Sequence, residues 1–141
     1  MPGVTVGVDG SDHSRKALEW AIREAGLRGT SLTVLAVHQV ASNHWTGNPE
    51  TYASDAPETE TVRQAAEDAV QKAVSQAGEP APASVTVRAV TGVAAHELVA
   101  ASADADLVVV GSGGGGVLRK ALGSVSSQVV SHAHAPVVVI R

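Results

Sequence analysis

Apolar residues along this chain follow two alternating patterns, one typical of buried strands and the other of helices. Short runs rich in valine, leucine and isoleucine predict strands at residues 4–8, 31–37, 85–90, 107–110 and 137–140. Between these runs, apolar residues recur at helical spacing, which predicts helices at residues 14–28, 58–77, 93–101 and 124–132. The predicted order is therefore strand and helix in strict alternation, ending on a strand.

This alternation predicts an α/β fold in which one parallel sheet carries helices on both faces. Crossovers between parallel strands are right-handed, and a doubly wound sheet reverses its winding at one point. We expect a single doubly wound domain over residues 1–141, with a five-stranded parallel sheet in the order 3-2-1-4-5. That order makes the first and fourth strands neighbours, so the turns after them open onto one crevice, where such folds bind ligands.

Local signals mark the ends of the predicted elements. Ser11 or Ser14 can cap the first helix, and Gly29 is placed to end it. Residues 38–57 are polar and irregular, and a connection of about 20 residues is long for a compact domain. Two interpretations stand for that segment: a functional lid over the site, or a partly mobile loop.

Composition and charge narrow the class of protein. The chain has 141 residues, of which 44% are hydrophobic, and this fits one folded domain. It contains no cysteine, which excludes a disulfide framework, and its net charge of −4 argues against a nucleic-acid partner. No apolar run reaches the roughly 18 residues of a membrane helix, and the first residues lack the pattern of a signal peptide. We therefore expect a cytoplasmic protein with no membrane partner.

The stretch from residue 107 to residue 130 carries the most suggestive chemistry. A strand leads into a glycine cluster, residues 111 and 113–116, and Gly123 and Ser124 then stand at the head of a helix. Glycines let backbone N–H groups approach an anion, and a helix start favours negative charge. This arrangement favours a nucleotide phosphate at the loop. The alternative is that residues 113–116 form only a flexible connector.

Several other chemistries lack their motifs. The run from residue 111 to residue 116 fits G-x-G-x-x-G, but it follows the fourth strand, and no acidic residue lies about 20 positions on. There is no G-x-x-x-x-G-K-[ST] loop and no G-x-S-x-G elbow. The six histidines show no zinc spacing and are interpreted as surface or capping residues. We expect neither a catalytic residue nor a metal bound by the protein itself.

The two ends of the chain together resemble the universal stress protein family. The N-terminal VTVGVDGSDHSRKALEWA is similar to that family's first strand, acidic turn and first helix. The C-terminal VVVGSGGGGVLRKALGSVSSQVVSHAHAPVVVIR is similar to its phosphate loop, last helix and final strand. ATP-binding members carry G-x2-G-x9-G-[ST]. Here eight residues, 115–122, separate Gly114 from Gly123, so the loop is one residue short.

The resemblance implies a nucleotide site and a regulatory function. Asp9 and Gly10 would lie at the adenine or ribose end of the nucleotide, and Val37 would pack near the adenine. The implied ligand is ATP or another adenine nucleotide, with Mg²⁺ carried by its phosphates, in a stress-response protein with at most slow ATP hydrolysis. The ribose and phosphates would be surrounded by loop and helix-start residues: Gly111, Gly113, Gly114, Gly123, Ser124 and Val125.

Simpler structural explanations exist for the same residues. Asp-Gly pairs are common in turns, which is enough to explain Asp9, and helix capping alone is enough to explain Ser124. The shortened loop keeps a second function open, namely a dimeric interaction module of the same fold that binds no nucleotide. Residues 137–140 form an apolar edge strand, and the resemblance implies a homodimer that pairs this strand in antiparallel contact.

Overall fold

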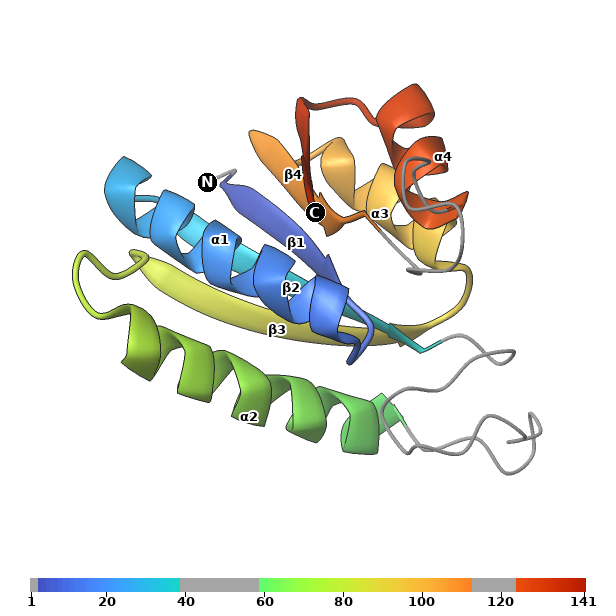
Figure 1. Ribbon diagram of the computed structural model, residues 1–141. Helices are drawn as coiled ribbons and strands as arrows, with labels where there is room; N and C mark the ends of the chain where they lie inside the picture. Colours follow the sequence, from blue (N-terminus) through green and yellow to red (C-terminus); the bar gives the residue numbers. More distant parts are fainter. Residues whose placement is uncertain (1–2, 39–58, 113–123) are drawn as a thin grey trace.

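Strands and helices alternate along the chain as predicted (Figure 1). The structure is a computed structural model that describes residues 3–38, 59–112 and 124–141. The strands are β1 (Val4–Val8), β2 (Ser31–His38), β3 (Ser84–Thr91), β4 (Leu107–Gly111) and β5 (Val137–Ile140). The helices are α1 (Asp12–Arg28), α2 (Thr59–Ala77), α3 (Ala94–Ser102) and α4 (Ser124–His132).

The strands form one five-stranded sheet in the order β3-β2-β1-β4-β5, which confirms the predicted order. Every neighbouring pair is parallel, and Val6 of the central strand lies opposite Val34 of β2 and Val109 of β4. The winding reverses between β1 and β4, so the carboxyl ends of these two strands flank the switch point of the sheet. β3 and β5 form its two edges.

Helices cover both faces of the sheet. α1 and α2 contact each other on one face, and α3 and α4 contact each other on the opposite face (Figure 1). The side chains of β2 alternate between the two: Val34 and Ala36 join the core under α1 and α2, whereas Leu35 and Val37 join the core under α3 and α4. None of the helices in the described part of the chain combines the length and apolar character that a membrane crossing requires.

The ends of α1 follow the predicted capping signals. Of the two candidate N-caps, Ser11 is the one used: its hydroxyl accepts a 3.3 Å hydrogen bond from the Ser14 N–H, so α1 begins at Asp12 rather than at Ser14. Gly29 is the C-cap and has a φ of 64°, in the left-handed region that glycine adopts without strain. Both caps are therefore set by residues that local sequence identifies.

A buried hydroxyl joins α3 to the segment between α4 and β5. Ser102 is the last residue of α3 and is 0% exposed. Its Oγ donates a 2.6 Å hydrogen bond to the Val99 carbonyl and accepts a 2.9 Å hydrogen bond from the His134 N–H. This contact fixes the approach to β5 against the helices on that face.

Candidate functional site

The turn after β1 is held by short-range hydrogen bonds around Asp9. The Asp9 carboxylate oxygen Oδ1 accepts from the Ser11 N–H at 2.9 Å, and the Asp9 N–H donates to Ser14 Oγ at 3.2 Å. Gly10 has a φ of 86°, so the turn needs glycine at that position. Turn formation by Asp9 is therefore confirmed. The residue also remains exposed at the carboxyl end of the central strand, where a carboxylate can accept hydrogen bonds from a ligand.

Gly111 ends β4 and lies against the first turn of α1. A Cβ atom built on Gly111 would lie 2.8 Å from the His13 carbonyl oxygen and 3.2 Å from the His13 Cβ. Because that carbonyl belongs to helical backbone, it cannot rotate away as a flexible side chain would. Glycine is thus required at position 111 for packing alone, and its absence of a side chain brings the start of α1 beside the end of β4.

The end of β4 is also tied to β5 and α4. The Ser112 N–H donates a 2.8 Å hydrogen bond to the Ile140 carbonyl, and the Ser126 hydroxyl donates a long 3.4 Å hydrogen bond to the Ser112 carbonyl. Residues 112 and 126, which flank residues 113–123 (the glycine segment), are therefore in contact. Ser124 begins α4 as predicted. Three predicted phosphate-loop residues lie outside the described residues: Gly113, Gly114 and Gly123.

Two apolar residues of the predicted site belong to one cluster. Val37, near the end of β2, is 5% exposed and lies in the core that contains Val110 and Val129. Val125, in the first turn of α4, is partly buried against the same cluster. The structure therefore brings Val37 and Val125 together on the face covered by α3 and α4.

A pocket of about 300 Å³ opens on the other face, between α1 and α2. The small side chains of α2 at this place leave room beside the end of β1 and the turn after it. Of the predicted site residues that the structure describes, Gly10 alone lines this pocket. The described lining residues are Val8, Gly10, Ser11, Asp12, Ser14, Arg15, Leu18, Ala65, Ala66 and Ala69.

His38 is a residue that sequence reasoning misplaced. Interpreted as a surface histidine at the start of a polar segment, it is instead the last residue of β2, paired with Thr91 of β3 and only 1% exposed. That interpretation is wrong because the pairing with β3 extends one residue beyond the apolar run. The available signal was spacing, since His38 continues the buried alternate positions of Val34 and Ala36. Within the described ranges, neither ring nitrogen of His38 has a hydrogen-bond partner.

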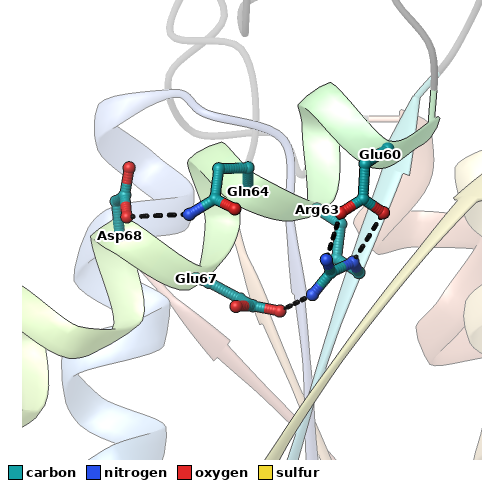
Figure 2. Close-up of polar contacts among 5 residues, drawn as sticks. All are labelled: Glu60, Arg63, Gln64, Glu67 and Asp68. Atoms are coloured by element: carbon teal, nitrogen blue, oxygen red, sulfur yellow. Dashed lines mark hydrogen bonds and ion pairs between the residues drawn. The ribbon is translucent and has the colours of Figure 1, made fainter.

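Charged side chains gather along the first half of α2 (Figure 2). Arg63 lies between Glu60 and Glu67 and forms ion pairs with both, while Gln64 donates a 3.3 Å hydrogen bond to Asp68. The hydrogen bond from Arg63 lowers the pKa of Glu60, and the same contact raises the pKa of Arg63. These are pairs one helical turn apart on an exposed surface, and their effect is to support the helix.

No metal-binding cluster accompanies these features in the part of the chain that the structure describes. Within residues 3–38, 59–112 and 124–141, no group of three or more histidine, aspartate or glutamate side chains is placed to hold an ion. What the described residues do assemble is an edge with a carboxylate, backbone N–H groups at the start of α4, and apolar side chains. That combination is suited to binding a small molecule.

Comparison with known proteins relates the whole domain to one family. Residues 3–141 match the model of the Universal stress protein family. Universal stress protein Rv2005c of Mycobacterium tuberculosis is 40% identical over 146 residues, covering 99% of this chain and 48% of that protein. A universal stress protein of Mycolicibacterium smegmatis is 34% identical over 140 residues, covering 99% of this chain and 48% of that protein. The chain thus spans about half the length of the curated relatives it matches.

Solved structures share the same fold. Universal stress protein UspA from Lactobacillus plantarum superposes with a TM-score of 0.74 at 24% identity, covering 99% of this chain and 97% of that chain. A crystal structure of a universal stress protein in complex with cAMP superposes with a TM-score of 0.65 at 26% identity, covering 99% of this chain and 96% of that chain. Both alignments extend over essentially the entire domain.

Proposed function

Because the chain belongs to the universal stress protein family, whose members act in the stress response, we propose that it binds an adenine nucleotide at the carboxyl edge of β1, β2 and β4. The observation that carries this proposal is the adjacency of β1 and β4 at the switch point of the sheet. It sets the Asp9 turn near Gly111, the last residue of β4. The family member solved with cAMP supports the same class of ligand.

Each predicted residue has a role in the proposed complex. Asp9 and Gly10 contact the base or ribose, and Val37 packs near the adenine. The phosphates accept hydrogen bonds from backbone N–H groups of the glycine segment and of the start of α4, with Mg²⁺ as their counter-ion. ATP is the proposed physiological ligand. The residues proposed around the ribose and phosphates are Gly111, Gly113, Gly114, Gly123, Ser124 and Val125.

The proposed activity is regulatory binding, with at most slow ATP hydrolysis. Occupancy of the site would change the shape of the domain or its choice of partner. We further propose a homodimer through β5, because this edge strand consists of Val137–Ile140 and its side chains are only partly buried. The shortened loop supports one alternative function, a dimeric interaction module that holds no nucleotide.

The decisive experiment identifies what the purified protein carries. Protein prepared without added nucleotide is denatured, and the released small molecules are identified by mass spectrometry. We expect an adenine nucleotide near one equivalent. An empty extract, together with no thermal shift on adding ATP and Mg²⁺, would overturn the proposal and leave the interaction module.

A matched pair of variants tests the site itself. Asp9→Asn keeps an oxygen for the Ser11 N–H and removes the charge, so the turn is preserved. Asp106→Asn makes the same change at an exposed residue just before β4, at the opposite end of the sheet. Calorimetric titration with ATP should show affinity weakened about tenfold by the first variant, the loss of one charge-assisted contact, and unchanged by the second. Equal affinities for both variants would remove Asp9 from the site.

A further inference from the structure

Among the polar side chains of the described residues that have no hydrogen-bond partner, the side chain of His38 is the most completely buried. Only 1% of the residue is exposed, and neither Nδ1 nor Nε2 has a hydrogen-bond partner in the described residues. A neutral imidazole carries one donor and one acceptor, and burying both unpaired costs free energy. Because the large majority of buried side-chain polar atoms have a hydrogen-bond partner, the unpaired ring of His38 calls for an explanation.

The backbone of His38, by contrast, takes part in the sheet. Its carbonyl accepts a 3.2 Å hydrogen bond from the Gly92 N–H, and the residue pairs with Thr91. The Thr91 hydroxyl lies 3.3 Å from the hydroxyl of Thr59, the first residue of α2. His38 is therefore held at the carboxyl end of β2, beside the start of α2, whereas its ring has no hydrogen-bond partner in the described residues.

Free space lies on the same face of the sheet. Leu32, Val34 and Ala36 join the core under α1 and α2, so His38, two residues after Ala36, lies on that face. Val8, which lines the pocket of about 300 Å³, pairs with Ala36. His38 thus lies about 7 Å beyond the pocket wall along the strand direction, toward the edge where ligands bind.

We infer that the imidazole of His38 is a ligand-contact group, which hydrogen-bonds the nucleoside part of the nucleotide. This inference rests on the proposed function. The phosphates are assigned to the end of β4, and β1 lies between β4 and β2. With two strand spacings across the sheet and two residues along β2, His38 is about 12 Å from the end of β4. That separation matches the length of a nucleoside, whose base and ribose carry both donors and acceptors for an imidazole. At that distance His38 lies away from the phosphate contacts assigned to the end of β4.

The test compares three ligands on His38 variants of the full chain. His38→Leu removes the ring's polar atoms, whereas His38→Asn and His38→Gln keep a donor and an acceptor. His96→Leu, at an exposed position of α3, is the matched control. Calorimetry with ATP, AMP and inorganic tripolyphosphate separates nucleoside contacts from phosphate contacts. The melting temperature of each ligand-free variant is measured alongside.

We expect His38→Leu to weaken ATP and AMP about tenfold each and to leave tripolyphosphate unchanged. Its ligand-free melting temperature should equal or exceed that of the natural chain, because two unpaired buried nitrogens are removed. One of the two amide variants should recover part of the lost affinity. Unchanged affinity of His38→Leu for AMP, or a loss shared by tripolyphosphate, would overturn the inference. No binding of ATP or AMP by the natural chain would instead refute the proposed function itself.

Discussion

Removing the buried hydroxyl of Ser102 should destabilise the protein measurably although it changes one atom. Ser102→Ala deletes the acceptor of the His134 N–H and the donor to the Val99 carbonyl at a position that is 0% exposed. Each hydrogen bond of this kind contributes about 1 kcal/mol, and a donor left unsatisfied raises the cost, for a total of about 1–3 kcal/mol. Helix propensity acts in the opposite direction, since alanine is favoured over serine by about 0.5 kcal/mol.

Urea denaturation followed by circular dichroism measures the difference. The transition midpoint of Ser102→Ala should fall while the slope stays constant, because the surface exposed on unfolding is unchanged. Ser75→Ala, at an exposed position in α2, makes the same chemical change without the two contacts and isolates the helix-propensity gain. If the two variants are equally stable, the contact between α3 and the segment before β5 contributes nothing and the reasoning is refuted.

Three further predictions concern packing, charge and assembly. Gly26→Ala should cost about 1–3 kcal/mol in a denaturant titration, because its Cβ would overlap the Pro80 carbonyl oxygen. Arg63→Gln should return the lowered pKa of Glu60 to its ordinary value in an NMR titration. In the natural chain, the contribution of Glu60 to the free energy of unfolding is present above its unfolded pKa and is lost as pH falls through its lower folded pKa. Val139→Pro should convert the proposed dimer into a monomer in light scattering. The N–H of Val139 points away from β4 at the sheet edge, and proline removes this donor from the proposed strand pairing between the two copies.

Controls and contrary outcomes are specific to each. Gly29→Ala adds a Cβ with no atom within 4 Å, so it should cost less than Gly26→Ala, leaving only the strain of its φ of 64°. An unchanged Glu60 titration in Arg63→Gln would show that the contact in Figure 2 is not maintained in solution. The carbonyls of Pro136 and Ile140 accept hydrogen bonds from the N–H groups of Val108 and Ser112. Because alternate residues of a strand face the same neighbour, residue 139 directs its N–H away from β4. A dimer that persists in Val139→Pro would place the interface elsewhere.

The alternation of strands and helices was predictable because each element carries its own apolar pattern. The sheet order was predictable because few topologies satisfy right-handed crossovers, and the pairing of β1 with both β2 and β4 confirms it. The residues that escaped prediction depend on contacts distant in sequence. His38 becomes part of β2 only through Thr91, and the pocket beside α1 exists because α2 presents alanines there. The spacing of His38 after Val34 and Ala36 was a local hint of its burial, but its pairing partner and the pocket are set by contacts that no local pattern contains.

The candidate site also contains residues that could be predicted from the sequence and residues that could not. Asp9 and Gly10 were identifiable from turn chemistry, and the turn forms as that chemistry requires. Val37 and Val125 could be grouped only through the family resemblance, and the structure places both in one cluster. The need for glycine at position 111 could not be foreseen, because it arises from the carbonyl of His13, nearly a hundred residues earlier in the chain.

That close approach has an evolutionary consequence. Selection for a well-packed first helix is enough to retain glycine at position 111, whether or not a nucleotide is ever bound. A lineage could therefore lose its ligand, and let the rest of the loop drift, while this glycine persisted unchanged. Surveys that sort binding from non-binding relatives would do better to weigh a residue such as His38, whose buried ring nitrogens have no hydrogen-bond partner in the described residues, than a glycine that the empty fold already demands.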